Sequence, residues 1–233
     1  MRALAERVIQ AVKSDPGYVI DPGIGLSELI GEFWRRGAAA LRAQWTLRRV
    51  RGGRLRFAER GVEIRHRRRL SVGSGTVIEA HARLHCLSRQ GFSIGRRVTI
   101  GKFAILECTS VLWSLGKGLR IGDDSSVGDW SFVGCGGGVE IGNRVIMGQR
   151  VAIHSQNHRF DRTDVPIQRQ GVTEEGVRIG DGCWLGSGSV ILDGVVLGSD
   201  CVVAAGAVVT TSFPDNSVIA GVPARLLETR GAG

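Results

Sequence analysis

The sequence has no long apolar run and no paired cysteine motif. None of its apolar stretches approaches the roughly 18 to 20 residues that a membrane-spanning helix needs, and the basic N-terminus lacks the apolar centre of a secretory signal peptide. The five cysteines form no CxxC pair, and Cys183 and Cys201 lie eighteen residues apart. We therefore expect small buried thiols rather than disulfides or a metal site, in a protein of a reducing cytoplasm.

A six-residue repeat runs through most of the chain. From Ile179 to Val209 a branched apolar residue recurs at every sixth position, and glycine or alanine often follows it. Shorter runs in the same pattern lie upstream, at Val72, Ile78, Leu84; Ile94, Ile100, Leu106; Ile121, Val127, Val133; and Ile141, Met147, Ile153. A period of six fits neither an α-helix nor an alternating strand. It is typical of a parallel β-helix, in which each hexad is a short strand plus a corner and its apolar residue points inward.

The hexads are interrupted where loops are expected to leave the coil. Breaks follow Leu84, Leu106 and Ile153, and the longest gives a protruding loop over residues 154–176 that carries His154 and His158. Insertions in a solenoid cluster on one face and often build the binding site. This loop is therefore the candidate functional segment.

Positive charge is concentrated before the solenoid. Residues 1–70 hold 16 Lys/Arg and 7 Asp/Glu, a net charge of +9, whereas residues 71–233 hold 15 of each. We expect residues 1–63 to form a basic, partly helical extension, residues 64–212 the β-helix, and residues 213–233 a C-terminal segment.

The basic extension contains a predicted amphipathic helix. Trp34 and Trp45 stand among arginines in it, Ser27 is the expected cap, and Gly52-Gly53 the expected end. Such a helix lies on an anionic membrane surface or packs between subunits, and the membrane is the favoured interpretation. Nucleic acid ranks last, because no nucleic-acid motif is present and the solenoid has no basic excess.

Over roughly residues 70–228 the sequence resembles the hexapeptide-repeat acyltransferases. The stretch "VRIGDGCWLGSGSVILDGVVLGSDCVVAAGAVVTTSFPDNSVIAGVPARLL" is similar to that family from its W-[IL]-G to its A-G-x-P-A-R motif, and the loop "NHRFDRTDVPIQRQG" resembles the H-x-F…P-I-x-x-Q-G pattern of its exopolysaccharide branch. The resemblance is closest to the exopolysaccharide and capsule O-acetyltransferases and the galactoside and maltose acetyltransferases. It implies a left-handed β-helix, a homotrimer, and acetyl-CoA as the donor to a sugar hydroxyl of a polysaccharide or lipid-linked glycan precursor, at the inner face of the membrane.

The resemblance also assigns residues on the acceptor side. His158 matches the family's general base, and a histidine suits that role near neutral pH. His154 orients His158, lines the pocket, or is an ordinary corner residue. Trp184 borders the pocket or merely covers the coil. Gln170 fits the branch pattern as a contact to the acceptor.

Four further residues match positions that bind the donor. Ser187 matches a site beside the thioester carbonyl, where a backbone N–H can stabilise the oxyanion. Ala205 and Gly206 match the trough for the pantetheine arm, and Arg225 matches a contact to a CoA phosphate. The chain departs from the family at Thr210-Thr211, where Thr-Lys is common.

Two other classes of function stay open. Some left-handed β-helices are metal-dependent hydratases of the γ-carbonic-anhydrase type, and the pairs His81/His85 and His154/His158 raise that alternative. A spacing of four does not align side chains on a six-residue coil, and no third histidine lies at a matching hexad position, so no metal is expected. The last alternative is a non-catalytic scaffold that is anchored to a membrane by the basic extension.

Overall fold

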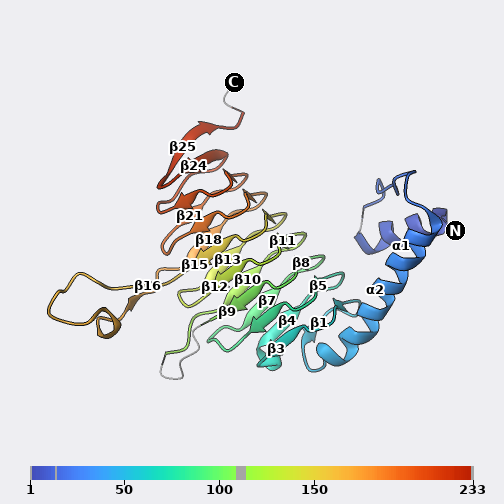
Figure 1. The fold of residues 1–233 in the computed structure, drawn as a ribbon, viewed down its shortest axis with the longest axis horizontal. Coiled ribbons are helices and arrows are strands. Elements are labelled where there is room, and N and C mark those ends of the chain that lie inside the picture. The colour runs from blue at the N-terminus through green and yellow to red at the C-terminus, as the bar shows by residue number, and fades with distance from the viewer. Residues whose placement is uncertain (1, 14, 109–113, 232–233) are drawn as a thin grey trace.

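The protein folds into a left-handed parallel β-helix with a helical arm at one end and a long loop at the other side (Figure 1). The computed structural model describes residues 2–13, 15–108 and 114–231. The loop expected after Leu106 and the end of the C-terminal segment therefore lie partly outside the described residues. Each coil contributes one strand to each of three parallel sheets, which we call A, B and C in the order in which the chain passes through them.

The strands are two or three residues long in every coil, and only the last two are longer. Sheet A consists of β1 (Arg51–Gly52), β4 (Leu70–Val72), β7 (Phe92–Ile94), β10 (Leu119–Ile121), β13 (Val139–Ile141), β18 (Val177–Ile179) and β21 (Val196–Leu197). Sheet B consists of β2 (Phe57–Ala58), β5 (Val77–Ile78), β8 (Thr99–Ile100), β11 (Ser126–Val127), β14 (Ile146–Met147), β19 (Trp184–Leu185), β22 (Val202–Val203), β24 (Ser217–Gly221) and β25 (Ala224–Thr229). Sheet C consists of β3 (Glu63–Arg65), β6 (Arg83–His85), β9 (Ile105–Glu107), β12 (Phe132–Gly134), β15 (Ala152–His154), β20 (Val190–Ile191) and β23 (Val208–Val209).

The core is the stack of inward-pointing hexad residues. The six apolar positions from Ile179 to Val209 are each at most 3% exposed, which confirms the predicted repeat. Cys183 and Cys201 are buried and unpaired, also as predicted. Burial raises the pKa of the Cys183 thiol to about 12, so this thiol is a packing group and not a nucleophile at neutral pH.

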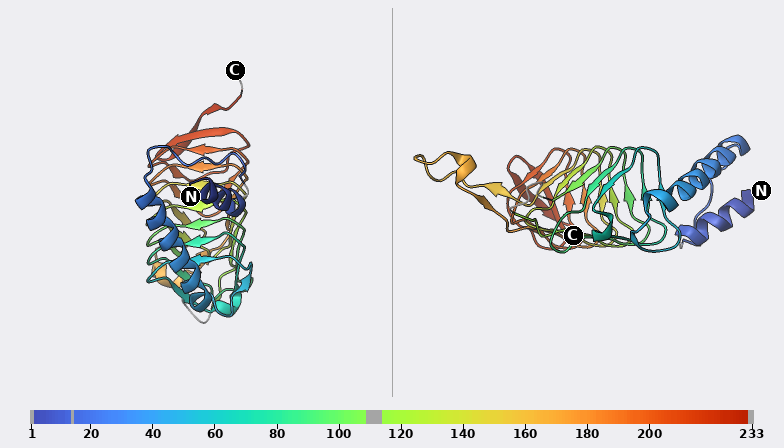
Figure 2. Two further views of the ribbon diagram at one scale, coloured as in Figure 1. Left: turned by 90° about the vertical axis from the view of Figure 1, so that its right-hand side faces the viewer. Right: turned by 90° about the horizontal axis from the view of Figure 1, so that it is seen from below.

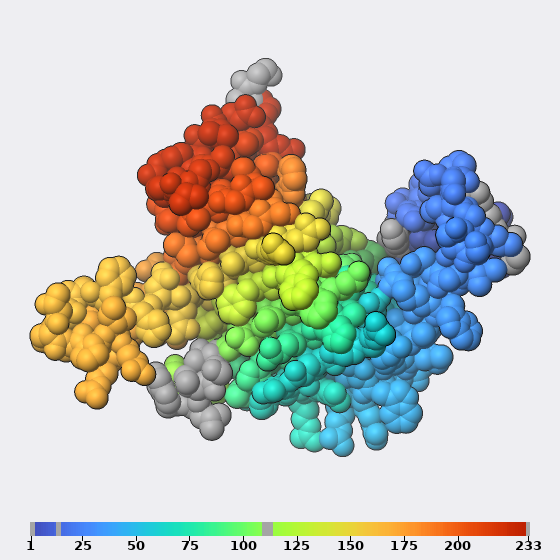
Figure 3. Space-filling model, in the orientation of Figure 1, coloured from blue at the N-terminus to red at the C-terminus, as the bar shows by residue number. Residues whose placement is uncertain are grey.

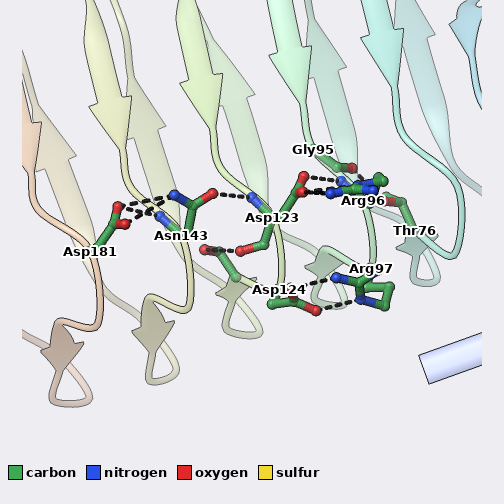
Figure 4. Close-up of polar contacts among 9 residues, drawn as sticks. Thr76, Gly95, Arg96, Arg97, Asp123, Asp124, Asn143 and Asp181 are labelled. Atoms are coloured by element: carbon green, nitrogen blue, oxygen red, sulfur yellow. Dashed lines mark hydrogen bonds and ion pairs between the residues drawn. The ribbon is translucent and has the colours of Figure 1, made fainter. Parts of the chain in front are cut away.

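The corners between sheets A and B are held by a ladder of side-chain oxygens (Figure 4). The N–H of Arg96 donates to Asp123 Oδ1 at 2.8 Å, the N–H of Asp123 to Asn143 Oδ1 at 2.9 Å, and the N–H of Asn143 to Asp181 Oδ1 at 2.8 Å. Each side chain thus satisfies a backbone donor of the coil before it, which the strand ladders leave free at a corner. This explains why aspartate or asparagine follows the glycine in these hexads.

The helical arm consists of α1 (Arg2–Lys13) and α2 (Leu26–Thr46). Helix α2 lies across the first coil, where Ala39 packs with Phe57 and Val77. Ala43 and Leu47 belong to the main core cluster. Helix α2 therefore packs on the solenoid through a face that contains alanine residues.

The ends of α2 differ from the expected ones. Gly25 is the N-cap and has no side chain with which to cap the helix. Ser27 lies inside the first turn, where its hydroxyl donates to Glu28 at 2.9 Å. The helix ends at Thr46, since Leu47 turns the chain into the core, and Gly52 lies in strand β1. Both the predicted cap and the predicted end were wrong.

The coil begins at β1, earlier in the chain than residue 64, where we expected the β-helix to begin. In the described residues no helix is both long enough and apolar enough to cross a bilayer. At the other end β25 turns back on β24 as an antiparallel neighbour, and this hairpin extends sheet B.

The long loop between β15 and β18 projects from the solenoid on the side away from the helical arm (Figures 2 and 3). Its base is an antiparallel ribbon of β16 (Asn157–His158) and β17 (Val172–Thr173), and its outer part contains the short helix η2 (Ile167–Arg169). We call residues 155–176 the histidine loop.

Candidate functional site

The two histidines of the sequence motif share one hollow, which we call the histidine hollow. It encloses about 280 Å³ at the corner between sheets C and A, where the histidine loop leaves the coil. His154 at the end of β15 and His158 on β16 line it together with Glu107 and Phe132. The His154 ring packs against the Phe132 ring with 5.3 Å between centroids and a tilt of 37°. Two exposed imidazoles beside a carboxylate can accept, hold and release a proton.

A glycine keeps the floor of the histidine hollow open. Glu107, Gly134 and His154 occupy the same register on β9, β12 and β15. A Cβ at Gly134 would lie 2.9 Å from the Phe132 ring, so any side chain there would fill the space between Glu107 and His154. Glu107 was not predicted from the sequence. Its signal was a carboxylate in the second position of a hexad, where glycine is usual.

His158 is positioned by the ribbon at the base of the histidine loop. It pairs with Val172, and the neighbouring Arg159 N–H donates to Gly171 O at 3.0 Å. The ribbon is tied to the coil by Asp193, whose carboxylate accepts bonds from the Thr173 hydroxyl at 2.9 Å and the Gly176 N–H at 2.8 Å. The catalytic candidate is thus carried by hydrogen-bonded backbone and not by a free loop.

Gln170 has its amide engaged inside the histidine loop. Its Nε2 donates to Arg162 O and Val165 O, both at 2.7 Å, and its Oε1 accepts from the Arg162 N–H at 3.1 Å. These bonds hold the outer turn of the loop in shape. The Gln170 side chain can contact an acceptor substrate only if these hydrogen bonds break.

The residues assigned to the donor lie elsewhere, along sheet B and the corner between sheets B and C, and Trp184, which was assigned to the acceptor side, lies with them and not in the histidine hollow. Trp184 is 54% exposed on β19. The Ser187 hydroxyl donates to Gln149 at 3.1 Å, and the Gly206 N–H donates to Ser187 O at 3.0 Å. Ala205 and Gly206 are exposed beside Ser187, so a strip of small residues runs along this corner.

Arg225 lies at the C-terminal end of the same sheet. It is exposed on β25, and its Nη1 donates to the carbonyl of Ala224 at 2.9 Å. A cation in this place stands at the end of the strip that Ser187 and Gly206 form.

Within one chain the donor residues lie apart from the histidine hollow. His154 follows Ile153, which pairs with Ile191, so its counterpart in the next coil is Leu192. Ser187 precedes Leu192 by five residues, and a strand rises by about 3.3 Å per residue. The donor corner and the histidine hollow therefore lie at opposite edges of sheet C, at most about 16 Å apart along this path.

The remaining histidines are engaged in stacking. The His81 ring stacks on Phe103 with 5.0 Å between centroids, and the His85 ring stacks on His66 at 5.3 Å. Among the described residues, no group of three or more His, Cys, Asp or Glu side chains is placed to hold a metal ion.

Comparison with known proteins identifies the repeat. Residues 176–211 match the family described as bacterial transferase hexapeptide (six repeats). The chain carries the hexapeptide repeat of the bacterial transferases. The resemblance seen in the sequence is therefore confirmed, and we call the coiled part the hexapeptide domain.

Two relatives match part of the chain. A candidate acetyltransferase of Mycobacterium tuberculosis is 32% identical over 74 residues, which are 32% of this chain and 25% of that protein. A candidate acetyltransferase of Dictyostelium discoideum is 48% identical over 80 residues, which are 34% of this chain and 40% of that protein. The chain thus spans less than half the length of these relatives.

The fold of the hexapeptide domain occurs in solved structures. AntD, an N-acyltransferase from Bacillus cereus in complex with dTDP and 3-hydroxybutyryl-CoA, superposes with a TM-score of 0.55 and 20% identity, over 78% of this chain and 83% of that one. This likeness shows the left-handed β-helix fold. The six-residue period predicted a parallel β-helix, and the family resemblance implied its left hand.

Proposed function

We propose that the protein is an acetyl-CoA-dependent O-acetyltransferase that modifies a sugar hydroxyl. The observation that carries this proposal is the histidine hollow, in which His154, His158 and Glu107 meet beside the hexapeptide repeat. A sugar hydroxyl is a poor nucleophile until its proton is removed, and a positioned imidazole supplies the base.

In this proposal His158 Nε2 or Nδ1 accepts the hydroxyl proton while the sugar oxygen attacks the thioester carbonyl of acetyl-CoA. The carbon–sulfur bond then breaks, and the thiolate of CoA takes a proton from the imidazolium of His158. His154 orients the acceptor or His158, and the carboxylate of Glu107 favours the imidazolium form that arises during the reaction. A backbone N–H at Ser187 stabilises the oxyanion.

A complete site, with the strip of small residues at Ser187 next to the histidine hollow, requires a second copy of the chain. Because the strip and the hollow lie at opposite edges of sheet C within one chain, we propose that the histidine loop of one copy reaches the corner of Ser187 and Ala205 on its neighbour. A closed ring of three copies, each giving a loop to the next, satisfies this requirement for every site. Mass measurement in solution should give a trimer. A fully active monomer would contradict the arrangement.

The outer face of α2 supports the proposed contact with an anionic membrane. Trp34 and Trp45 are 80% and 74% exposed, and Ile30 and Leu41 are exposed at the helical spacing that puts all four on one stripe. The opposite face is the alanine face that packs on the coil. A stripe of this kind, followed at once by the Arg48–Arg49 pair, suits the interface of a bilayer with anionic headgroups.

The direct test of the proposed activity is incubation of the pure protein with acetyl-CoA and a panel of glycan precursors. We expect a mass increase of one acetyl group on an acceptor and its absence with the His158→Ala variant. Zinc bound to the purified protein, together with hydratase activity and no acetyl transfer to any acceptor, would overturn the proposal.

A further inference from the structure

A second, larger hollow lies at the N-terminal end of the solenoid, and we call it the arginine hollow. It encloses about 620 Å³ between the end of α2 and the short helix η1 (Arg67–Arg69). Its lining contains His66 and five arginines, Arg48, Arg49, Arg67, Arg68 and Arg69. In the sequence these arginines are only part of a charged stretch. The fold places them around one concave surface.

The charge of the arginine hollow is not compensated by neighbouring carboxylates. Within residues 2–13, 15–108 and 114–231 none of its five guanidinium groups forms an ion pair. Arg69 donates to the Ser88 carbonyl, which leaves its guanidinium charge in place. Guanidinium groups bind phosphate through paired, charge-assisted hydrogen bonds. A cluster of this density fits a doubly or multiply charged phosphate group.

The arginine hollow and the histidine hollow lie on the same edge of the solenoid. Both open at the corner between sheets C and A, the first in the coil of β3 and the second in the coil of β15. In sheet C four ladder steps join Arg65 to His154, through β6, β9 and β12. Strands in a sheet are about 4.8 Å apart, so roughly 19 Å separates the two positions.

Polar side chains line the edge between the two hollows. His85 stacks on His66 of the arginine hollow, and Glu107 belongs to the histidine hollow. Between the two hollows lies a small depression of about 20 Å³, which is lined by Glu63, Arg65, Arg83, Leu84, His85 and Glu107. Glu63 forms ion pairs with Arg65 and Arg83 there. Sugar hydroxyl groups bind through hydrogen bonds, and this row of side chains offers both donors and acceptors for them.

We propose that this edge is the acceptor site, and that the acceptor is a phosphate-linked oligosaccharide. Its phosphate or pyrophosphate group binds the arginine hollow, and its glycan runs along β3, β6 and β9 to place one hydroxyl in the histidine hollow. This inference rests on the proposed acetyl transfer and adds the class of acceptor. A span of roughly 19 Å requires several sugar units, so a free monosaccharide does not reach both hollows.

The phosphate is carried by a nucleotide or by a lipid, and both present the same pyrophosphate to the arginine hollow. Matched acceptors separate the two sources. One oligosaccharide is prepared as its nucleoside diphosphate derivative, as its polyprenyl diphosphate derivative and as the phosphate-free glycan. The derivative with the lower KM is the natural source.

The test compares two double variants of equal charge. Arg67→Gln/Arg68→Gln removes two exposed cations of the arginine hollow, and Arg120→Gln/Arg178→Gln removes two exposed cations on the outer face of sheet A. We expect the first variant to raise KM for diphosphate-linked acceptors about tenfold with kcat retained, as loss of uniform binding does. Transfer to the phosphate-free glycan should be unchanged, and the second variant should behave as wild type.

Inorganic pyrophosphate gives a readout that is independent of activity. Calorimetry should detect its binding to wild type and to Arg120→Gln/Arg178→Gln, and a clear loss of binding with Arg67→Gln/Arg68→Gln. Equal binding by all three proteins, or equal KM values for the diphosphate-linked and phosphate-free glycans, would overturn the inference. If pyrophosphate binds as expected but no acceptor is acetylated, the arginine hollow is an anion site and the proposed acetyl transfer is what fails.

Discussion

Glu107 and His154 lie in register two coils apart, and the residue between them is Gly134. We expect Gly134→Ala to lower kcat/KM about tenfold, because the added methyl group occupies the space beside His154. The methyl would meet the Phe132 ring at 2.9 Å and the Ile153 carbonyl oxygen at 3.4 Å. The half-buried ring has to turn away, so the melting temperature should fall by a few degrees at most. Steady-state kinetics with a soluble acceptor and a thermal melt measure both effects.

The control for this variant is Gly31→Ala in α2. A Cβ at Gly31 has no heavy atom within 4 Å, and the substitution raises helix propensity. It should leave kcat/KM unchanged. A Gly134→Ala enzyme with full activity would show that the open floor is not used by the acceptor.

His158→Ala should lower kcat by roughly 10²- to 10⁴-fold, the usual contribution of a positioned general base. Binding of acetyl-CoA, measured by calorimetry, should barely change. His154→Ala should cost less, since we assign it an orienting role. A greater loss from His154→Ala than from His158→Ala would exchange the two roles, and His81→Ala, which alters a histidine far from the hollow, should leave kcat as in wild type.

Arg225→Ala should raise the KM for acetyl-CoA and leave kcat at saturation largely intact, because a phosphate contact contributes equally to ground state and transition state. Initial rates at several donor concentrations separate the two parameters. A defect confined to kcat would place Arg225 outside the donor site.

Acid should destabilise the fold through the corner ladder. The side chain and backbone N–H of Asn143 lower the pKa of Asp181, and the N–H and guanidinium of Arg96 lower the pKa of Asp123. Folding therefore favours the ionised carboxylates, and this stability is present at neutral pH and is lost as the pH falls below about 4 through the lowered pKa values.

Thermal melts between pH 7 and pH 3 test this dependence with Asp181→Asn. The variant should melt lower than wild type at pH 7 and should lose less on acidification, because one linked carboxylate is gone. Asp200→Asn, at an exposed left-handed corner position that asparagine tolerates, is the matched control. Parallel pH profiles for wild type and Asp181→Asn would contradict the linkage.

Vesicles of phosphatidylglycerol should bind the protein at low salt, and binding should weaken as salt screens the arginines. Trp34→Ala/Trp45→Ala should weaken binding about tenfold, since both rings enter the interface. Leu226→Ala/Leu227→Ala, at exposed positions on β25, serves as the control. Absence of flotation with anionic vesicles at low salt would end the membrane proposal and favour packing of the arm between subunits.

The hexads from Ile179 to Val209 could be predicted because a bulky inward residue recurs in every strand. The first coil could not be recognised from the repeat, because its inward-facing positions include Gly52 and Ala58. Leu47 from the arm helps to fill the core there. Small residues give no periodic signal.

The candidate site was only half visible in the sequence. His158 could be found because a polar motif interrupts the repeat. Glu107 lies 51 residues before it in the chain, and only the register of sheet C brings the two into one hollow. The bonds of Gln170 within the loop could not be read either, because its partners are backbone carbonyls that any sequence offers.

The position of α2 across the first coil also bears on solubility. Strands β1, β2 and β3 are the edge strands of their sheets, and uncovered edges of this kind recruit further strands from other molecules. By covering β2 and closing the core with Ala43 and Leu47, the helix terminates the stack at this end. A chain that starts at residue 51 should therefore associate head to tail into fibres, while the full chain stays a discrete particle.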